Sequence, residues 1–378
     1  MKIGIPTETK TDEYRVGMTP GGVREVSAHG HAVVVQQGAG AGVGMGDGEY
    51  REAGASIAES AADVFASTDM IVKVKEPQPE ECRMLREQQV LFTYLHLAPD
   101  PNQAGLLRES GVVAIAYETV TGTNNSLPLL APMSEVAGRM SVQAAAHSLE
   151  KAHSGSGVLL GGVPGVAAAE ILVIGGGVVG TNALRMALGL GARVTVVDKS
   201  IERLKELDVQ IGSQLNTIYS TTDALEHYAA QADAVIGAVL IPGASAPKLV
   251  TRNILKSMRP GSVFVDVAID QGGCAETSRP TTHSEPTYVE EGVVHYCVAN
   301  MPGAVPRTST LALNNATLPF ILALADKGYR RALLEDRNLM AGLNVYRGRI
   351  THSAVAEALG RDYVPVHKAL GSSLSVVG

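Results

Sequence analysis

Short runs of apolar residues alternate with amphipathic stretches along the first third of the chain. Each run is four or five residues long, which suits a buried strand of a parallel sheet better than a helix. The stretches between them, such as Pro20–His29 and Ser60–Ser67, have helical patterns. This alternation predicts βα units and a largely parallel sheet. The predicted strands are Ala32–Val35, Met70–Val74, Val90–Thr93 and Val112–Ala116.

A polar break at Gly122–Pro128 ends this pattern, and a second set of βα units runs from Glu170 to about Asn300. Between the two sets the pattern predicts a helix from Ser134 to about Lys151, with Ser134 as its N-cap. A long helical pattern, Leu311–Lys327, follows the second set. The remainder of the chain is expected to be helical, with polar faces.

The length of 378 residues suits two domains better than one core. We therefore predict an α/β fold of two domains, each with a parallel sheet, and a cleft between them. One domain is discontinuous and comprises residues 1–130 and 307–378. The other, residues 131–306, is inserted within it.

The composition narrows the class of protein. Hydrophobic residues make up 45% and charged residues 18%, which is enough to bury two cores. The formal net charge of −7 gives no basic footprint for nucleic acid. Three cysteines without a CxxC pair (Cys82, Cys274 and Cys297) favour reduced thiols over disulfides or a metal site.

No segment indicates export, a membrane span or a metal. The apolar start of Met1–Pro6 breaks too early for a signal peptide, and longer apolar stretches are interrupted before the ~20 residues of a span. The histidines form no HExxH motif, and GxSxG is absent. We therefore expect a cytoplasmic protein with neither a membrane partner nor a bound metal.

A glycine-rich turn is the first chemical motif. Ile171–Ile174 predicts a strand, and Gly175-Gly176-Gly177-Val178-Val179-Gly180 follows it with the spacing G-x-G-x-x-G. Gly175 permits the tight turn, Gly177 lets backbone approach a pyrophosphate, and Gly180 lets the helix pack on the strand. The helix Val178–Leu190 would direct its N-terminal N–H groups at phosphates. The motif predicts a dinucleotide-binding, Rossmann-like domain.

Asp198 ends the next predicted strand, Arg193–Val197, at the separation expected for an acid that binds ribose hydroxyls. Its carboxylate would repel a 2′-phosphate, so NAD is favoured over NADP. Lys199 and Arg203 lie close in sequence and blur this discrimination. The alternative is that Asp198 merely caps the following helix.

Three more polar residues follow apolar runs, where open parallel sheets bind ligands. Lys75 follows Met70–Val74, and His96 follows the run that begins at Val90. From position alone, a surface ion pair is the better interpretation of Lys75, and a core histidine the better one of His96. Asp270 follows the predicted strand Ser262–Val267, and turn chemistry explains it equally well.

Several stretches resemble the alanine dehydrogenase family, which is related to the nucleotide-binding subunit of proton-translocating transhydrogenase. The resemblance runs in the same order across essentially the whole chain. The stretches that carry it are Lys73–Pro77, Leu91–Leu97, Leu129–Arg139, the glycine-rich turn, Val265–Arg279 and His295–Gly303.

The resemblance implies roles for individual residues. Arg15 and Lys75 match substrate-binding positions, and His96 and Asp270 match the catalytic pair. Guanidinium can hold a carboxylate through two parallel hydrogen bonds, ammonium supplies a point charge, and imidazole exchanges protons near neutrality. The positions implied for the cofactor, besides Gly175, Gly177 and Gly180, are Ser134, Val178, Val179, Asp198, Arg203, Ser220, Val239, Leu240, Val267, Ala268, Ile269, Asp270, Val298, Ala299, Asn300 and Met301.

The resemblance also implies an activity: NAD-dependent oxidative deamination of L-alanine to pyruvate and ammonium, and the reverse reductive amination. The discontinuous domain would then be the substrate domain, and residues 131–306 the NAD-binding domain. A homo-oligomer, commonly a hexamer, is implied as well. Two alternatives stay open: a transhydrogenase-type subunit that binds NAD(H), and a dehydrogenase of another amino acid, such as a saccharopine- or ornithine-type enzyme.

Overall fold

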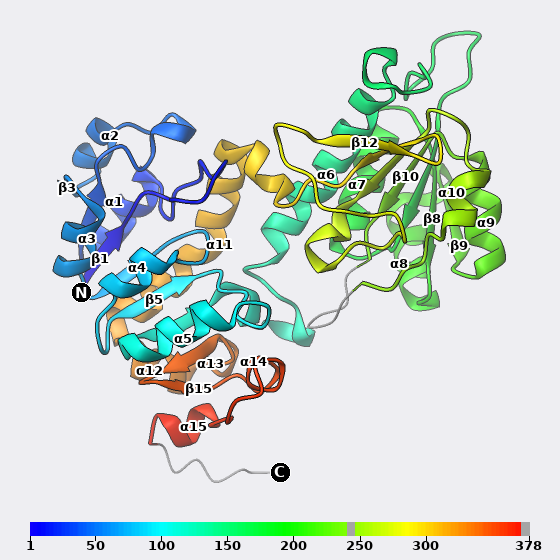
Figure 1. The fold of residues 1–378 in the computed structure, drawn as a ribbon. Coiled ribbons are helices and arrows are strands. Elements are labelled where there is room, and N and C mark those ends of the chain that lie inside the picture. Colours follow the sequence, from blue (N-terminus) through cyan, green and yellow to red (C-terminus); the bar gives the residue numbers. More distant parts are fainter. Residues whose placement is uncertain (240–245, 372–378) are drawn as a thin grey trace. The chain divides into compact units, whose positions relative to one another are not determined.

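A computed structural model of the chain describes residues 1–239 and 246–371 (Figure 1). The chain divides into two compact units. Unit 1 comprises Met1–Pro132 and Val305–Gly378, and unit 2 comprises Met133–Ala304. Each unit contains one sheet that is mostly parallel, so the predicted α/β class with two parallel-rich sheets is confirmed.

The sheet of unit 1 has eight strands in the order β15-β14-β6-β5-β4-β1-β2-β3. The strands from β6 to β3 pair in parallel, whereas β14 and β15 are antiparallel additions at one edge. Their bounds are β1 Lys2–Ile5, β2 Ala32–Gln36, β3 Ser56–Ala58, β4 Met70–Val72, β5 Val90–Thr93, β6 Val113–Ala116, β14 Leu343–Tyr346 and β15 Arg349–Ile350.

The last strands correct the prediction for the end of the chain. That region was expected to be helical with polar faces, but Leu343, Val345 and Ile350 are buried in β14 and β15. β14 pairs with β6, whose residues lie more than 200 positions earlier. The strand is therefore stabilised by a partner that local periodicity does not reveal.

Several helices of unit 1 begin at a side-chain cap. Thr19 accepts a hydrogen bond from the Gly22 N–H, and Ser60 from the Asp63 N–H. One face of the sheet packs on α3, α4, α5 and α14. The helices are α1 Pro20–Ala28, α2 Asp47–Glu52, α3 Ala61–Ser67, α4 Pro79–Met84, α5 Pro101–Ser110, α11 Pro306–Lys327, α12 Tyr329–Glu335, α13 Arg337–Met340, α14 Ser353–Ala358 and α15 Val366–Ala369, with the 3₁₀ turns η1 Ala41–Val43, η2 Tyr117–Thr119 and η3 Thr123–Asn125.

Among the described residues, α11 is the one helix long and apolar enough to cross a membrane, judged by length and composition alone. Its side chains, however, support the loops of unit 1. Thr310 Oγ1 accepts from the Val16 N–H, and Asn314 Oδ1 accepts from the Thr19 N–H. Such buried contacts are typical of a core helix, and a core helix can meet the same criterion of length and composition as a membrane span.

The sheet of unit 2 has seven strands in the order β12-β13-β11-β10-β7-β8-β9. All pair in parallel except β12, which forms an antiparallel hairpin with β13. Their bounds are β7 Glu170–Ile174, β8 Arg193–Asp198, β9 Leu215–Tyr219, β10 Ala234–Gly237, β11 Val263–Asp266, β12 Thr287–Glu290 and β13 Val293–Tyr296.

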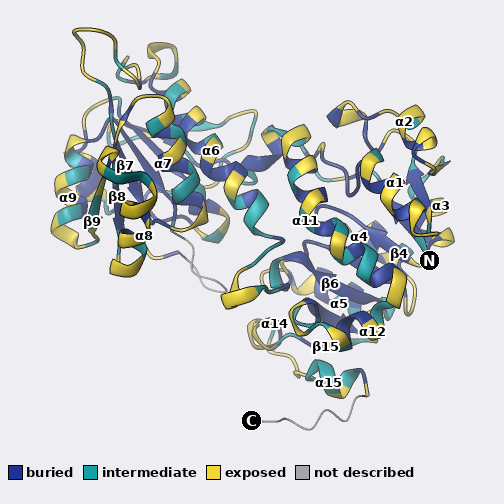
Figure 2. Ribbon diagram, turned by 180° about the vertical axis from the view of Figure 1, so that it is seen from behind, coloured by how far each residue is buried: buried dark blue, intermediate teal, exposed yellow. Residues whose placement is uncertain are grey.

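Alternate residues of β7 serve the two faces of this sheet. Ile171 and Val173 pack in one cluster with α6, α7 and α8, whereas Leu172 and Ile174 pack in another with α9 and α10. Figure 2 shows the central strands as mostly buried and the outer faces of α8 and α9 as exposed. The helices are α6 Ala131–Ser148, α7 Val178–Gly189, α8 Ile201–Ile211, α9 Thr222–Gln231 and α10 Arg252–Ser257, with the 3₁₀ turns η4 Lys151–His153, η5 Gly212–Gln214, η6 Val267–Gln271 and η7 Met301–Ala304.

The start of α6 differs from the prediction. Ser134 was expected to be its N-cap, but the helix begins three residues earlier, at Ala131, so Ser134 lies inside its first turn. Pro132 fits the first turn because the N–H that it lacks has no helical partner there. The Ala131 N–H donates instead to the Leu127 carbonyl at 2.9 Å. The cap assignment was therefore wrong.

Candidate active site

The glycine-rich turn after β7 has the geometry that a dinucleotide requires. Gly175 has a φ of +99°, and a Cβ on it would lie 2.8 Å from the Ala238 carbonyl oxygen. A Cβ on Gly180 would lie 1.8 Å from the Gly175 oxygen, which no side chain tolerates. Gly177, the N-cap of α7, faces open space. Gly175 and Gly180 are thus required for the close backbone packing of the turn. Gly177 leaves room for a phosphate at the N-terminus of α7.

Asp198 stands at the end of β8 beside this turn. Its Oδ2 accepts from the Gly176 N–H at 2.7 Å, and its Oδ1 accepts from the Ser200 N–H at 2.8 Å. Ser200, rather than Asp198, caps α8 through the Arg203 N–H. Asp198 therefore links the glycine-rich turn to the following loop, a position suited to a ribose.

Arg203 is bound to the same turn. Its Nε donates to the Gly176 carbonyl at 2.7 Å, and its Nη2 donates to Thr181 Oγ1 at 2.7 Å. Its Nη1 pairs with Glu206 at 2.5 Å. A guanidinium with these partners supports the loop and would have to release them to bind a 2′-phosphate.

Most of the remaining predicted cofactor residues follow the carboxyl ends of neighbouring parallel strands. Ser220 follows β9 and donates its N–H to the Asp198 carbonyl at 3.0 Å, while Val239 follows β10. Because these strands run in parallel, their ends meet at one edge, which we call the carboxyl edge of unit 2. Val267, Ala268, Ile269 and Asp270 lie in η6 after β11, Val298, Ala299, Asn300 and Met301 follow β13, Ser134 and Val178 lie in α6 and α7, and Leu240 lies outside the described residues.

The side chains of several of these residues are not accessible to a ligand. Val179, Val298 and Met301 are buried in the hydrophobic cluster of α6 and α7. A cofactor could therefore contact them mainly through backbone atoms.

Asp270 and Asp266 are two acids with different environments. Asp270 is exposed, and its Oδ1 is 3.4 Å from the Asn300 N–H. Asp266 is fully buried and accepts from the Ala268 N–H, the Cys274 N–H and the Ser278 hydroxyl at 2.5–3.1 Å. Asp266, which sequence analysis did not single out, fixes the turn that presents Asp270.

In unit 1, Lys75 follows β4, and its main chain is fixed on both sides. The Val74 and Lys75 N–H groups donate to the carboxylate of Glu8 at 2.7 and 3.2 Å, and the Lys75 carbonyl accepts from Thr93 Oγ1 at 2.9 Å. Burial opposes ionisation of Glu76, but Lys75 and Lys10 outweigh it and lower the pKa of this carboxyl. The main chain of Lys75 is thus held firmly after the strand.

A buried charged group lies behind Lys75. Lys73 is fully buried, and its Nζ lies 3.2 Å from Glu8 and 2.7 Å from Glu81. Burial lowers the pKa of this amine, but Glu8 and Glu81 raise it more, so Lys73 stays protonated. Sequence analysis assigned no role to these three residues.

His96 is exposed, which excludes the core-histidine alternative. It follows β5 with a φ of +47°, a conformation unusual for a side chain with a Cβ. Glu118, after β6, accepts from the Leu95 and His96 N–H groups, the latter at 2.6 Å. The imidazole stacks on Tyr94, with ring centroids 5.8 Å apart. Glu118 therefore holds the turn that exposes the ring, and sequence analysis missed it.

Arg15 is buried and already forms the bidentate pair predicted for a substrate. Its Nε and Nη2 donate to the two oxygens of Glu13 at 2.6 and 2.5 Å. Burial lowers the pKa of the guanidinium, but Glu13 raises it more. A substrate carboxylate would have to share the guanidinium with Glu13 or displace it.

The loop that carries Arg15 is pressed against β4. A Cβ on Gly17 would lie 2.5 Å from the Val72 carbonyl oxygen, at the strand's last residue. The loop thus lies at the edge where Lys75 and His96 leave their strands, which we call the carboxyl edge of unit 1. The structure brings Arg15, Lys75 and His96 to this edge.

Two family models match nearly the whole chain. The N-terminal domain of alanine dehydrogenase/PNT matches residues 4–137, and the C-terminal domain of alanine dehydrogenase/PNT matches residues 141–353. These matches confirm the resemblance found in the sequence.

Individual relatives agree. A protein named alanine dehydrogenase from Halomonas elongata is 60% identical over 98% of this chain and 100% of its own length. A solved structure of L-alanine dehydrogenase aligns with a TM-score of 0.93 and 51% identity, covering 95% of this chain and 99% of that one. A transhydrogenase from Sinorhizobium meliloti aligns less closely, with a TM-score of 0.80 and 27% identity over 94% of this chain and 100% of that one. The chain belongs to the alanine dehydrogenase/PNT family.

Proposed function

We propose that this chain is an alanine dehydrogenase, which interconverts L-alanine with pyruvate and ammonium and uses NAD. The observation that carries the proposal is the full-length identity of 60% to a protein named alanine dehydrogenase. The carboxyl edge of unit 1 supports it, because it gathers two cations and an exposed imidazole. These are the groups that oxidation of an amino acid needs.

The family and the glycine-rich turn imply a nicotinamide dinucleotide, which supplies the acceptor and donor of hydride when bound. We assign NAD rather than NADP. The carboxylate of Asp198 favours ribose hydroxyls and repels a 2′-phosphate. The hydrogen bonds of Arg203 to Gly176 and Thr181 support this choice, because they engage the guanidinium that could otherwise bind a 2′-phosphate.

Arg15 and Lys75 are the proposed substrate-binding residues. Arg15 would bind the substrate carboxylate, with Glu13 keeping the guanidinium charged and oriented. Lys75 would stabilise negative charge that develops on the substrate oxygen. Its rigid main chain supports this role, because electrostatic stabilisation requires a charge that is already in place.

His96 is the proposed general acid and base. It would take a proton from the water that attacks the imine and return it when ammonium leaves. Asp270 would assist proton handling at the amine. We assign substrate chemistry to unit 1 and dinucleotide binding to unit 2.

The substrate and cofactor assignments are tested by a panel of amino acids with NAD⁺ and NADP⁺. L-Alanine with NAD⁺ should give the highest kcat/KM. Binding of NADH without turnover of any amino acid would favour the transhydrogenase-type alternative. A preference for a larger amino acid would instead favour another dehydrogenase.

The assembly and compartment are also proposals. We expect a homo-oligomer, a hexamer by resemblance to the family, located in the cytoplasm. Light scattering coupled to size-exclusion chromatography measures the first, and a monomer at micromolar concentration would contradict it. Cell fractionation tests the second.

A further inference from the structure

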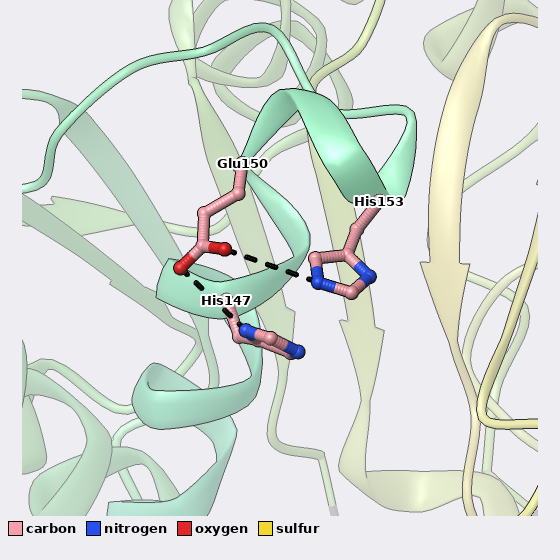
Figure 3. Close-up of side chains that lie close together, drawn as sticks. All are labelled: His147, Glu150 and His153. Carbon is pink, nitrogen blue, oxygen red and sulfur yellow. Dashed lines mark ion pairs between the residues drawn. The ribbon is translucent and has the colours of Figure 1, made fainter.

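Two histidines and a glutamate gather at the C-terminal end of α6, in unit 2 (Figure 3). His147 lies in the last turn of α6, Glu150 follows the helix, and His153 ends η4. One potential ligand atom from each lies within 4.8 Å of the other two. Figure 3 shows the carboxylate of Glu150 directed towards both rings. Sequence analysis found no motif here and expected no metal.

The spacing of these atoms suits a shared cation better than direct bonds. Glu150 lies 3.5 Å from His147 Nδ1 and 3.9 Å from His153 Nε2. A charge-assisted hydrogen bond would be about 2.7–2.9 Å. Ligands of a tetrahedral Zn²⁺ with bonds of about 2.0–2.1 Å stand about 3.3 Å apart. Small side-chain rotations would therefore convert the group into a coordination shell.

The backbone that carries the three side chains is well fixed, although the side chains are accessible. Leu149, between His147 and Glu150, is fully buried in the core. The Gly155 N–H donates to the Glu150 carbonyl at 3.1 Å, and the Gly157 N–H donates to the Leu149 carbonyl at 2.7 Å. A Cβ on Gly155 would lie 2.3 Å from the Ser148 carbonyl oxygen. The turn is thus held closed without a metal, and the ligands start near one another.

The donor set selects the class of cation. Imidazole nitrogen suits Zn²⁺ and its late first-row neighbours, whereas Mg²⁺ and Ca²⁺ prefer all-oxygen ligands. We propose that His147, Glu150 and His153 bind one divalent late transition-metal ion of the Zn²⁺ type, which staples the end of α6 to η4. Water completes the coordination, since the side chains are accessible.

The metal site lies apart from the glycine-rich turn. Near its N-terminal half, α6 touches α7, where a Cβ on Gly138 would lie 2.2 Å from the Val179 oxygen. His147 is nine residues further on, or about 14 Å along a helix. The following turn reaches the amino end of β11, because the Ser156 N–H donates to the Gly261 carbonyl at 2.7 Å. Zinc should therefore bind without displacing NAD, and the proposal does not rest on the enzymatic activity.

Equilibrium dialysis tests the site. Untagged chain, stripped with a chelator, is dialysed against ZnCl₂, and bound zinc is measured by mass spectrometry. We expect one high-affinity zinc per chain, retained in excess MgCl₂. His153→Ala and His147→Ala should each weaken it by more than about 10-fold, since even loss of an outer-shell partner has that effect. Tm should rise with ZnCl₂ in the wild type but not in His147→Ala or His153→Ala.

Matched controls separate this group from other histidines. His227→Ala removes an exposed histidine elsewhere in unit 2, and His29→Ala disrupts a pair of histidines on Asp326 in unit 1. Both should bind zinc as the wild type does. Retention of zinc by His153→Ala, its loss in either control, or competition between zinc and NAD would overturn the proposal.

Discussion

The carboxyl edges of the two units have the same architecture, but charged side chains form one edge and glycines form the other. The edge of unit 1 is built by charged side chains. Its exposed groups depend on the buried residues Glu8 and Lys73 and on the partly buried Glu118. The edge of unit 2 depends on missing side chains at Gly175 and Gly180. The parallel strands thus define only the position of each edge. The residues after each strand determine whether charged side chains or backbone groups are exposed there.

The substitution His96→Ala should distinguish the functions of the two edges most clearly. We expect turnover to fall by about 10²–10⁴-fold, because a general acid and base is lost. NAD affinity should stay unchanged, because no dinucleotide contact is assigned to unit 1. Steady-state rates and an NADH titration measure the two effects. The control His29→Ala should retain turnover, and a parallel loss of NAD affinity in His96→Ala would contradict the division of roles.

Lys73→Met tests whether the edge of unit 1 depends on buried charge. The variant leaves Glu8 and Glu81 buried without their cation, which should cost about 3–5 kcal/mol of unfolding free energy. Denaturant unfolding measures it. The control Lys327→Met removes a partly exposed lysine paired with Glu335 and should change little. Equal effects of the two substitutions would argue against a special role for the buried group.

Asp198→Asn tests the charge at the edge of unit 2. The amide keeps the size of the side chain but loses the charge that favours ribose and repels a 2′-phosphate. NAD affinity should fall by about 10- to 100-fold, the value of a hydrogen bond to a charged group. The ratio of kcat/KM for NAD⁺ over NADP⁺ should fall too. An unchanged ratio would speak against the ribose assignment.

The smallest effect should be a pH dependence in unit 2. Burial lowers the pKa of His295, against a smaller opposing effect of the Val293 carbonyl that its Nδ1 contacts at 2.9 Å. The unfolded chain therefore binds this proton first as the pH falls below about 6.5. The unfolding free energy should decline below that pH and be insensitive to this group above it. His295→Gln should flatten the decline, and the exposed control His227→Gln should not.

The contrast between the edges also explains what the sequence could predict. The turn after β7 was predictable because G-x-G-x-x-G and the flanking strand and helix are local features. Lys75 and His96 were predictable as residues after strands. Their partners Glu8 and Glu118 were not, because the strand ends that they bind lie 66 and 22 residues away. β14 was missed for the same reason, since its partner is distant in sequence.

The buried charges show a further limit of pattern analysis. Lys73 and Lys75 are separated by one residue, yet one is fully buried and the other partly exposed. Apolar periodicity does not distinguish them, because Lys73 continues a buried strand end and is neutralised by acids from elsewhere. Only the fold shows which of the two lysines is accessible.

The most direct test of the account is to follow the hydrogen on Cα of alanine. Wild-type chain is incubated with NAD⁺ and L-alanine deuterated at Cα, and the reduced dinucleotide is isolated and analysed by mass spectrometry. We expect NADH that carries the deuterium, with pyruvate formed in equal amount. A chain that binds NAD⁺ but returns it unreduced, without deuterium, would contradict it.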